Sequence, residues 1–158
     1  MDRKKFLVLG LLASTTAILE STVAQENLGK ASIDEALSAF LTAFDNLDWP
    51  AFRNCFSRTA TIFHPAAPNI RRIDSPDLFE KAWLGVFERI KKSSGRTSPP
   101  YMTLNPLDLR VDNLCGDVAL VTFHLVDRDT VSRRTVVFKR DSGAWKVVHI
   151  HASNMAAI

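Results

Sequence analysis

The side chains best suited to chemistry in this sequence of 158 residues are its four histidines, His64, His124, His149 and His151. An imidazole has an ordinary pKa of about 6.5, so near neutral pH it can move a proton, bind a metal ion or orient a ligand. His149 and His151 are two residues apart within a run of β-branched and aromatic residues, and this spacing puts both on one face of a strand. The surrounding elements decide which of these chemistries is open to each histidine.

The stretch that carries the last two histidines, residues 135–153, reads TVVFKRDSGAWKVVHIHAS and predicts a β-hairpin. Two runs rich in strand-forming residues flank Asp141, Ser142 and Gly143, which favour a tight reversal of the chain. The second arm of this hairpin is expected to be the last strand of the fold.

Alternation along the second arm sorts its side chains onto two faces. One face is expected to hold Trp145, Val147, His149 and His151, and the other Lys146, Val148, Ile150 and Ala152. Neither face is polar throughout, so both need cover, by helices on one side and by a partner subunit on the other. The same spacing across the turn pairs Arg134 with His151.

Two roles are open to His149 and His151. As hydrogen-bonded groups they can stabilise the strand or a subunit interface, together with Arg134, and this is the role that we predict. As a pair at positions i and i+2 they could also chelate a metal ion, but binding would need a third ligand such as His124 or His64. We therefore predict no metal site and no cofactor.

Helix signals come first in the chain and strand signals last. Ser32 and Glu35 have the spacing of a capping box, and Ser75 is followed by a proline that suits the first turn of a helix. The expected elements are helices at 32–46, 48–56 and 75–92, a short strand at 60–64, a loop at 65–74, strands at 102–112, 118–127 and 131–140, and the closing strand.

This order predicts an α+β fold in which N-terminal helices pack on one face of a strongly curved, antiparallel-rich sheet. A hydrophobic content of 46% and a charged content of 23% are ordinary for a soluble globular domain. The net charge of +3 is too small for a nucleic-acid surface, and no basic stripe with interleaved aromatic residues occurs. We expect one folded domain and no nucleic-acid partner.

Residues 1–24 have the pattern of an export signal, with a basic start, an apolar run at 6–19 and small residues before a cleavage point after Ala24. An uncleaved N-terminal anchor is the alternative. Cleavage would leave a domain over 25–158 in the periplasm or outside the cell, without stable membrane insertion.

An oxidising compartment would allow Cys55 and Cys115 to form a disulfide. Two buried free thiols are the alternative, because spacing alone does not show whether the two side chains meet. The absence of CxxC spacing argues against a structural zinc site.

With its elements in order, the chain resembles the NTF2-like superfamily, in particular the SnoaL-like proteins and the association (hub) domain of calcium/calmodulin-dependent protein kinase II. The resembling segments are FDNLDWPAF at 44–52, ATIFHP at 60–65, TLNP at 103–106, GDVALVTF at 116–123 and WKVVHIHAS at 145–153. The last is the most specific, because a W-x-x-V-H-x-H-x-S ending is characteristic of this group. The resemblance implies a cone with a funnel-shaped pocket between helices and sheet, and dimers or larger rings built through the outer face of the sheet.

The resemblance does not imply one activity, because the superfamily includes isomerases, dehydratases, hydrolases, adaptors and oligomerisation modules. Pocket arginines of the hub domain correspond here to His124, Thr135 and Ala152, so most of a charged clamp is missing. Arg134 lies one residue from such a position and would point to the opposite face unless a bulge shifts the register. A carboxylate of the hub domain corresponds to His64, and the kinase domain itself is absent.

Two functions are consistent with these expectations. The first is an exported module that forms a homodimer or larger ring and binds a small, partly apolar organic molecule in the funnel. The second is an isomerase, dehydratase or hydrolase that uses His124 or His64 as general acid–base. For either function, the expected pocket wall includes Phe63, His64, Trp83, His124 and Thr135. Spacing alone singles out no acid–base pair and no nucleophile.

Overall fold

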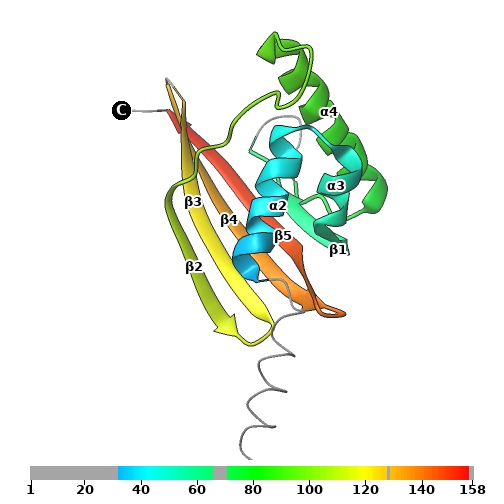
Figure 1. Ribbon diagram of the computed structural model, residues 1–158, viewed down its shortest axis with the longest axis vertical. Coiled ribbons are helices and arrows are strands. Elements are labelled where there is room, and N and C mark those ends of the chain that lie inside the picture. Colours follow the sequence, from blue (N-terminus) through cyan, green and yellow to red (C-terminus); the bar gives the residue numbers. More distant parts are fainter. Residues whose placement is uncertain (1–31, 66–70, 128, 157–158) are drawn as a thin grey trace, which may run out of the picture. The chain divides into compact units, whose positions relative to one another are not determined.

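The computed structural model describes residues 32–65, 71–127 and 129–156 (Figure 1). These ranges belong to one compact unit, Ala31–Ile158. The predicted export signal, residues 1–24, lies outside the described residues. No helix within the three ranges is long and apolar enough to cross a membrane.

The α-helices of the described ranges form where the sequence predicts them. In α2 (Ile33–Asp45) the Ser32 hydroxyl accepts a hydrogen bond from the Glu35 amide, and the Glu35 carboxylate accepts one from the Ser32 amide. This capping box satisfies amides that have no partner within the helix. α3 (Trp49–Asn54) and α4 (Pro76–Ser94) are each capped by the side chain of the preceding residue and carry proline in the first turn.

The sheet has five strands in the order β1-β5-β4-β3-β2. They are β1 (Phe56–Phe63), β2 (Leu107–Cys115), β3 (Val118–Asp127), β4 (Thr130–Asp141) and β5 (Ala144–Ala156). β1 runs parallel to β5, and the other neighbouring pairs are antiparallel. The helices lie on one side of this open, curved sheet (Figure 1), which confirms the predicted α+β class and the predicted hairpin.

Two strands begin at other residues than predicted. β1 begins at residue 56 rather than 60, and β2 begins at Leu107, five residues later than the expected start. The segment before β2 hydrogen-bonds to the end of α2 instead of to a strand. The Tyr101 amide donates to the Asp45 backbone oxygen at 2.8 Å, and the Leu104 amide donates to the Asp45 carboxylate at 2.8 Å. These amides are therefore not available to a β ladder.

The core lies between the helices and the sheet face that packs against them, here called the inner face; the opposite face is the outer face. Phe52 of α3 is fully buried, and its ring centroid lies 4.9 Å from that of Phe56 and 4.8 Å from that of Trp83. Both pairs are edge-to-face contacts, which aromatic rings prefer. Val121 of β3 and Val136 of β4 close this core from the sheet side.

One extra residue in β5 changes the register of the closing hairpin. Next to the turn the pairing follows the prediction, and Phe138 lies opposite Val147. The next pair is Val137 with His149, so Val148 is left without a partner on β4 and forms a β-bulge. From the bulge onward, every residue of β5 pairs one position away from the predicted register.

The bulge breaks the strict alternation expected for the last strand. Four side chains are buried on the inner face, two on each side of the bulge: Trp145, Val147, Ile150 and Ala152. His149 and His151 consequently lie on the outer face. The predicted pairing of Arg134 with His151 is wrong, because Arg134 lies opposite Ala152 and Thr135 lies opposite His151.

Both cysteines are free thiols. Cys55 is half-buried after α3, and burial raises the pKa of its thiol, which donates a hydrogen bond to the Ala51 backbone oxygen at 3.4 Å. Cys115 is exposed at the end of β2. The disulfide is therefore absent from this structure, and of the two thiols only Cys55 is shielded from solvent.

Candidate functional site

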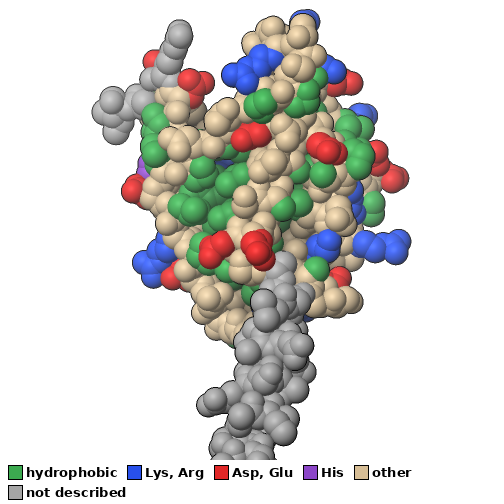
Figure 2. Space-filling view, in the orientation of Figure 1, with side chains coloured by type: hydrophobic (Ala, Val, Ile, Leu, Met, Phe, Trp, Pro, Cys, Tyr) green, Lys and Arg blue, Asp and Glu red, His purple; other side chains and the backbone are tan. Residues whose placement is uncertain are grey.

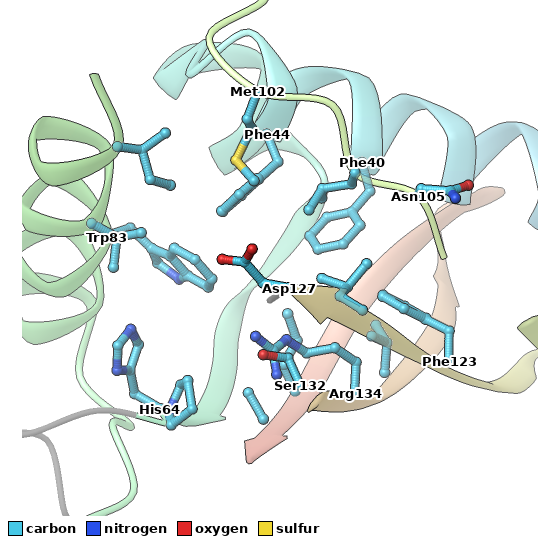
Figure 3. A pocket seen from close by; sticks show the side chains of 18 of the residues that line it. Phe40, Phe44, His64, Trp83, Met102, Asn105, Phe123, Asp127, Ser132 and Arg134 are labelled. Carbon is cyan, nitrogen blue, oxygen red and sulfur yellow. The ribbon is translucent and has the colours of Figure 1, made fainter. Parts of the chain in front are cut away.

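A cavity of about 560 Å³ opens between the helices and the inner face of the sheet (Figure 3). It lies where the family resemblance implies a funnel, and its volume is in the range of small-molecule pockets. Most of the wall is apolar and comes from helices and strands alike, including Phe40, Phe44, Ile62, Trp83, Phe123 and Ile150. Such a wall suits a ligand with an apolar body.

Polar side chains interrupt this apolar wall on the sheet side. His64 follows β1, Asp127 ends β3, and Ser132 and Arg134 lie on β4 (Figure 3). Ser132 and Arg134 are two residues apart on one strand, so they share the inner face. The cavity therefore offers an imidazole, a carboxylate, a hydroxyl and a guanidinium to one bound molecule.

Arg134 is the cation of this group. Its Nη1 donates hydrogen bonds to the backbone oxygens of Arg133 at 2.9 Å and Ser153 at 3.5 Å. Burial lowers the pKa of its guanidinium, because the charged form loses hydration. Among the described residues no carboxylate forms an ion pair with it. The remaining N–H donors of this partly buried cation are suited to binding an anion.

The position of Arg134 corrects the sequence-based prediction, which placed it among structural or interface groups. Its cross-strand partners are Phe123 on β3 and Ala152 on β5, and both are buried on the inner face. Residues directly opposite in a ladder point to the same side of a sheet, so Arg134 points inward as they do. The bulge at Val148 produces this match.

His64 and Trp83, two of the predicted wall residues, both line the cavity. Their ring centroids are 6.2 Å apart, with the ring planes at 76°. Trp83 is only 8% exposed, and its indole Nε1 is buried without a hydrogen-bond partner in the part of the chain that the structure describes. His64 thus gives the aromatic wall a group that can exchange a proton.

Phe63, His124 and Thr135, the other predicted wall residues, lie on the outer face. In each case both chain neighbours line the cavity, and successive side chains of a strand point to opposite faces. The predicted placement of these three side chains is therefore wrong. The His124 imidazole instead lies near the exposed Asp108 carboxylate, with 3.5 Å between Nδ1 and Oδ2.

The sequence did contain a signal for the orientation of His124. Its strand alternates the set Ala119, Val121 and Phe123 with the set Leu120, Thr122 and His124. The second set is the more polar one, which indicates the face turned away from the core. Arg134 has no such signal, because its orientation depends on a bulge in another strand. Asp127 ends a strand, a position that turn residues commonly occupy, so its place in the cavity was also missed.

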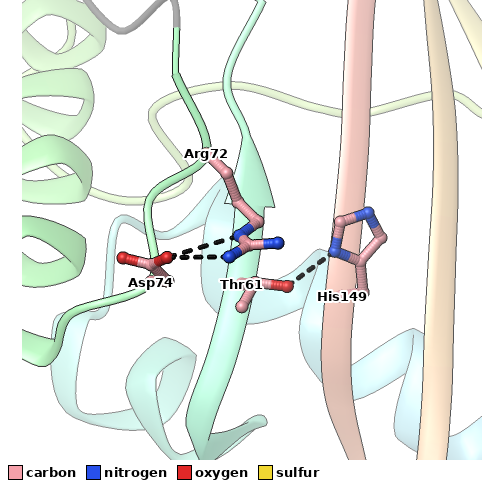
Figure 4. Close-up of polar contacts among 4 residues, drawn as sticks. All are labelled: Thr61, Arg72, Asp74 and His149. Carbon is pink, nitrogen blue, oxygen red and sulfur yellow. Dashed lines mark hydrogen bonds and ion pairs between the residues drawn. The ribbon is translucent and has the colours of Figure 1, made fainter.

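His149 and His151 lie on the outer face beside Phe63, with ring centroids 5.9 and 5.6 Å from the phenyl centroid. His149 Nδ1 is 2.7 Å from the Thr61 hydroxyl oxygen (Figure 4). Partial burial and the nearby His151 and Arg72 lower the pKa of His149, because each disfavours the charged imidazole. No group of three metal-ligating side chains gathers within the described ranges.

Apolar side chains also gather on the surface between α2 and the strands β2 and β3 (Figure 2). Leu107 and Leu109 of β2 are exposed, and Leu107 also lines the cavity. The apolar wall of the cavity therefore continues onto the surface on this side of the sheet.

Three solved structures show the range of proteins that share the fold of this chain. An NTF2-like protein of unknown function from Pseudomonas putida KT2440 is 19% identical over 87% of each chain, with a TM-score of 0.59. An uncharacterized protein with a cystatin-like fold from Caulobacter vibrioides is 15% identical over 86% of this chain and 90% of its own, with a TM-score of 0.59. The association domain of CaMKII from C. elegans is 20% identical over 85% of this chain and 98% of its own, with a TM-score of 0.55. At these identities the likeness shows the fold alone.

No curated protein matches the chain. The SnoaL-like domain family matches residues 33–158, which include all helices and strands that the structure describes. The chain therefore belongs to the SnoaL-like domain family and has the NTF2-like fold.

Proposed function

We propose that this protein binds a small, partly apolar organic anion in its cavity and assembles with copies of itself through the outer face of its sheet. The observation that carries the binding proposal is Arg134, a guanidinium in an apolar cavity without an ion-pair partner among the described residues. A carboxylate would take the place of the water that such a cation otherwise holds, and a planar guanidinium can bind both of its oxygens.

The shape and charge of the cavity narrow the class of ligand. A volume of about 560 Å³ and a largely apolar wall, partly aromatic, favour a compact apolar body. Asp127 lies on the same wall as Arg134 and would repel a negative charge placed beside it, whereas Arg89 of α4 is a second cation of the lining. A monocarboxylic acid with a ring or a short chain fits these conditions.

Self-association is supported by the fold and by the outer face. Structures with this fold include the association domain of CaMKII from C. elegans and a protein from Thiobacillus denitrificans that is described as a putative CaMKII association domain. On this chain the outer face carries half-buried Val137 and Leu120, and the helices that the structure describes lie on the other side of the sheet. A second copy would shield these side chains from water.

Export to the periplasm or the outside of the cell is part of the proposal. Its support is the sequence pattern of residues 1–24, which have a basic start and an apolar run. N-terminal sequencing of the protein recovered from its cells would test it, because export predicts a mature chain that begins near residue 25.

Binding can be tested by thermal unfolding with matched pairs of acids and amides as probes, namely phenylacetate with phenylacetamide and hexanoate with hexanamide. The acids are expected to raise the unfolding midpoint and the amides are not, since only the acids pair with the guanidinium. At about ten times its Kd a ligand stabilises the folded state by about 1.4 kcal/mol, which is measurable. Equal shifts from acid and amide would contradict an anion site.

A second candidate function is catalysis by general acid–base chemistry, and the position of His64 favours it. Its imidazole lines the same cavity as Asp127 and Arg134, so a bound acid would lie near a proton-transfer group. Isomerases and dehydratases that act next to a carbonyl need such a group.

This candidate can be tested by proton NMR of pyruvate and phenylpyruvate in D2O with the protein present. A general base would exchange the protons next to the carbonyl, and His64→Gln would slow the exchange by about a hundredfold or more. If the wild-type protein exchanges no protons, the enzymatic function is excluded for this substrate class, while anion binding still stands.

A further inference from the structure

Eight residues of the outer face, here called the central patch, form two neighbouring rows across β1, β5, β4 and β3. The first row is Phe63, His151, Thr135 and Thr122, and the second is Thr61, His149, Val137 and Leu120. No member of either row is an Asp, Glu, Lys or Arg. His149 and His151 are thus the groups of the patch that can change charge between about pH 5 and pH 8.

Charged side chains surround this patch on the neighbouring elements. They are Arg72 and Asp74 beside β1, Arg110 and Asp112 on β2, Arg133, Lys139 and Lys146 on the adjoining rows of β4 and β5, and Asp108 near His124. An uncharged centre within a charged rim is the usual anatomy of a protein interface.

We propose that assembly through the central patch is controlled by pH, with copies of this chain associated while His149 and His151 are neutral and separated once these imidazoles are protonated. This inference rests on the proposed self-association and adds its regulation.

Neutral imidazoles fit the patch as the structure shows it. The His149 ring is held by the Thr61 hydroxyl at 2.7 Å, and the rings of His149 and His151 contact Phe63. In a two-fold interface each copy presents the same surface, so the histidines of both copies are covered together. All of them can be covered without burying a charge.

Protonated imidazoles would destabilise an interface at the central patch. Covering a charged ring removes its water, and the positive charges of two copies would also repel one another. The neighbouring carboxylates that could offset this charge are already engaged. Asp74 pairs with Arg72 at 3.0 Å (Figure 4), and Asp112 pairs with Arg110 at 2.8 Å. Asp108 is near His124, outside the patch.

The direction of the pH effect follows from the single chain. The pKa of His149 is already lowered by burial and by His151 and Arg72, and cover by a second copy would lower it further. A base whose pKa is lower in the assembled state favours assembly above its ordinary pKa. Assembly then weakens as the pH falls through about 6.5 and below.

Sedimentation equilibrium of the full chain at about pH 8 and about pH 5.5 tests this proposal. For the wild type we expect the dissociation constant to rise at least about tenfold at the lower pH. A histidine whose pKa assembly lowers by one unit gives up to about fivefold at about pH 5.5, and a dimer contains two copies of His149. The double variant His149→Asn with His151→Gln should lose this dependence. His64→Gln, which changes a cavity histidine, should keep it.

Three results would overturn the inference: a pH-independent wild type, a double variant that keeps the full dependence, or loss of folded structure by circular dichroism at about pH 5.5 in the wild type. A wild type that is monomeric at both pH values would contradict self-association itself, which is a different failure. An independent measurement is the NMR titration of His149 in the wild type, whose pKa should be lower at high than at low protein concentration.

Discussion

Arg134 and Arg133 are consecutive arginines with opposite surroundings. Arg134 lies opposite Phe123 and Ala152, so it shares the inner face with the apolar wall of the cavity. Arg133 lies opposite His124 on the outer face and is exposed. A guanidinium therefore binds an anion more strongly at position 134 than at position 133, because an ion pair gains strength where water is excluded and is screened where water is present.

His149 gives a prediction for folding stability at the same scale. Its pKa is lower in the folded chain than in the unfolded one, so the unfolded state takes up the proton first as the pH falls. Its contribution to stability is greatest above about pH 6.5 and declines below that value. Urea denaturation measures the free energy of unfolding of the wild type and of His149→Asn at about pH 7.5 and pH 5.5. Between these pH values the variant should lose less of this free energy than the wild type. The difference should be below about 1 kcal/mol, since water screens a half-buried ring.

The comparison is best made in a chain that does not assemble, so that dissociation does not add to the measured change. Identical pH dependence of the two proteins would show that the surroundings of His149 do not affect its protonation.

At the scale of elements, the bulge in β5 keeps the core residues and the cavity residues of this strand on the same face of the sheet. It allows Trp145 and Val147 on one side, and Ile150 and Ala152 on the other, to face the helices. Deletion of Val148 would restore strict alternation and turn one of these pairs outward. We expect this deletion to destabilise the fold by more than about 3 kcal/mol, because large core side chains would be lost.

Val148→Ala is the matched control, since it keeps the extra residue and shortens only a half-buried side chain. We expect this substitution to lower the free energy of unfolding by about 1 kcal/mol. Urea denaturation of both variants measures the difference, and similar losses would show that the length of β5 does not determine its register.

Elements with strong local signals could be predicted from the sequence. The cap residues Ser32, Asp48 and Ser75 and the apolar spacing behind them place α2, α3 and α4, and the turn at Ser142 and Gly143 places the hairpin. The start of β2 could not be predicted, because it depends on hydrogen bonds to the distant Asp45.

The candidate site was predictable only in part, for the same reason. His64 and Trp83 follow from the end of a strand and the stripe of a helix, which are local patterns. Arg134 depends on an unpaired residue fourteen positions later, and neither Val147 nor Val148 marks the bulge by its type. Cross-strand register is a long-range property, so a one-residue shift moves side chains between faces without a local signal.

For the whole molecule, the outer face is the surface that assembly would cover. Thr135 lies in the middle of the central patch, between His151 on β5 and Thr122 on β3. Thr135→Arg would place a charge where a second copy has none to match it, and we expect a monomer at concentrations where the wild type is associated. Light scattering during gel filtration measures the mass of each.

Ser93→Arg is the control for that substitution, because it adds the same charge on an exposed position of α4, away from the sheet. It should leave the mass unchanged. A Thr135→Arg protein that assembles as the wild type does would place the interface on another surface.

The central claim, a cavity that binds a small organic anion through Arg134, is tested most directly by isothermal titration calorimetry with phenylacetate. The wild type and Arg133→Gln should bind the probe equally, since Arg133 points away from the cavity. Arg134→Gln should bind it about 10- to 100-fold more weakly, as expected for the loss of hydrogen bonds to a charged group. Unchanged binding by Arg134→Gln, or an equal loss in Arg133→Gln, would contradict the claim.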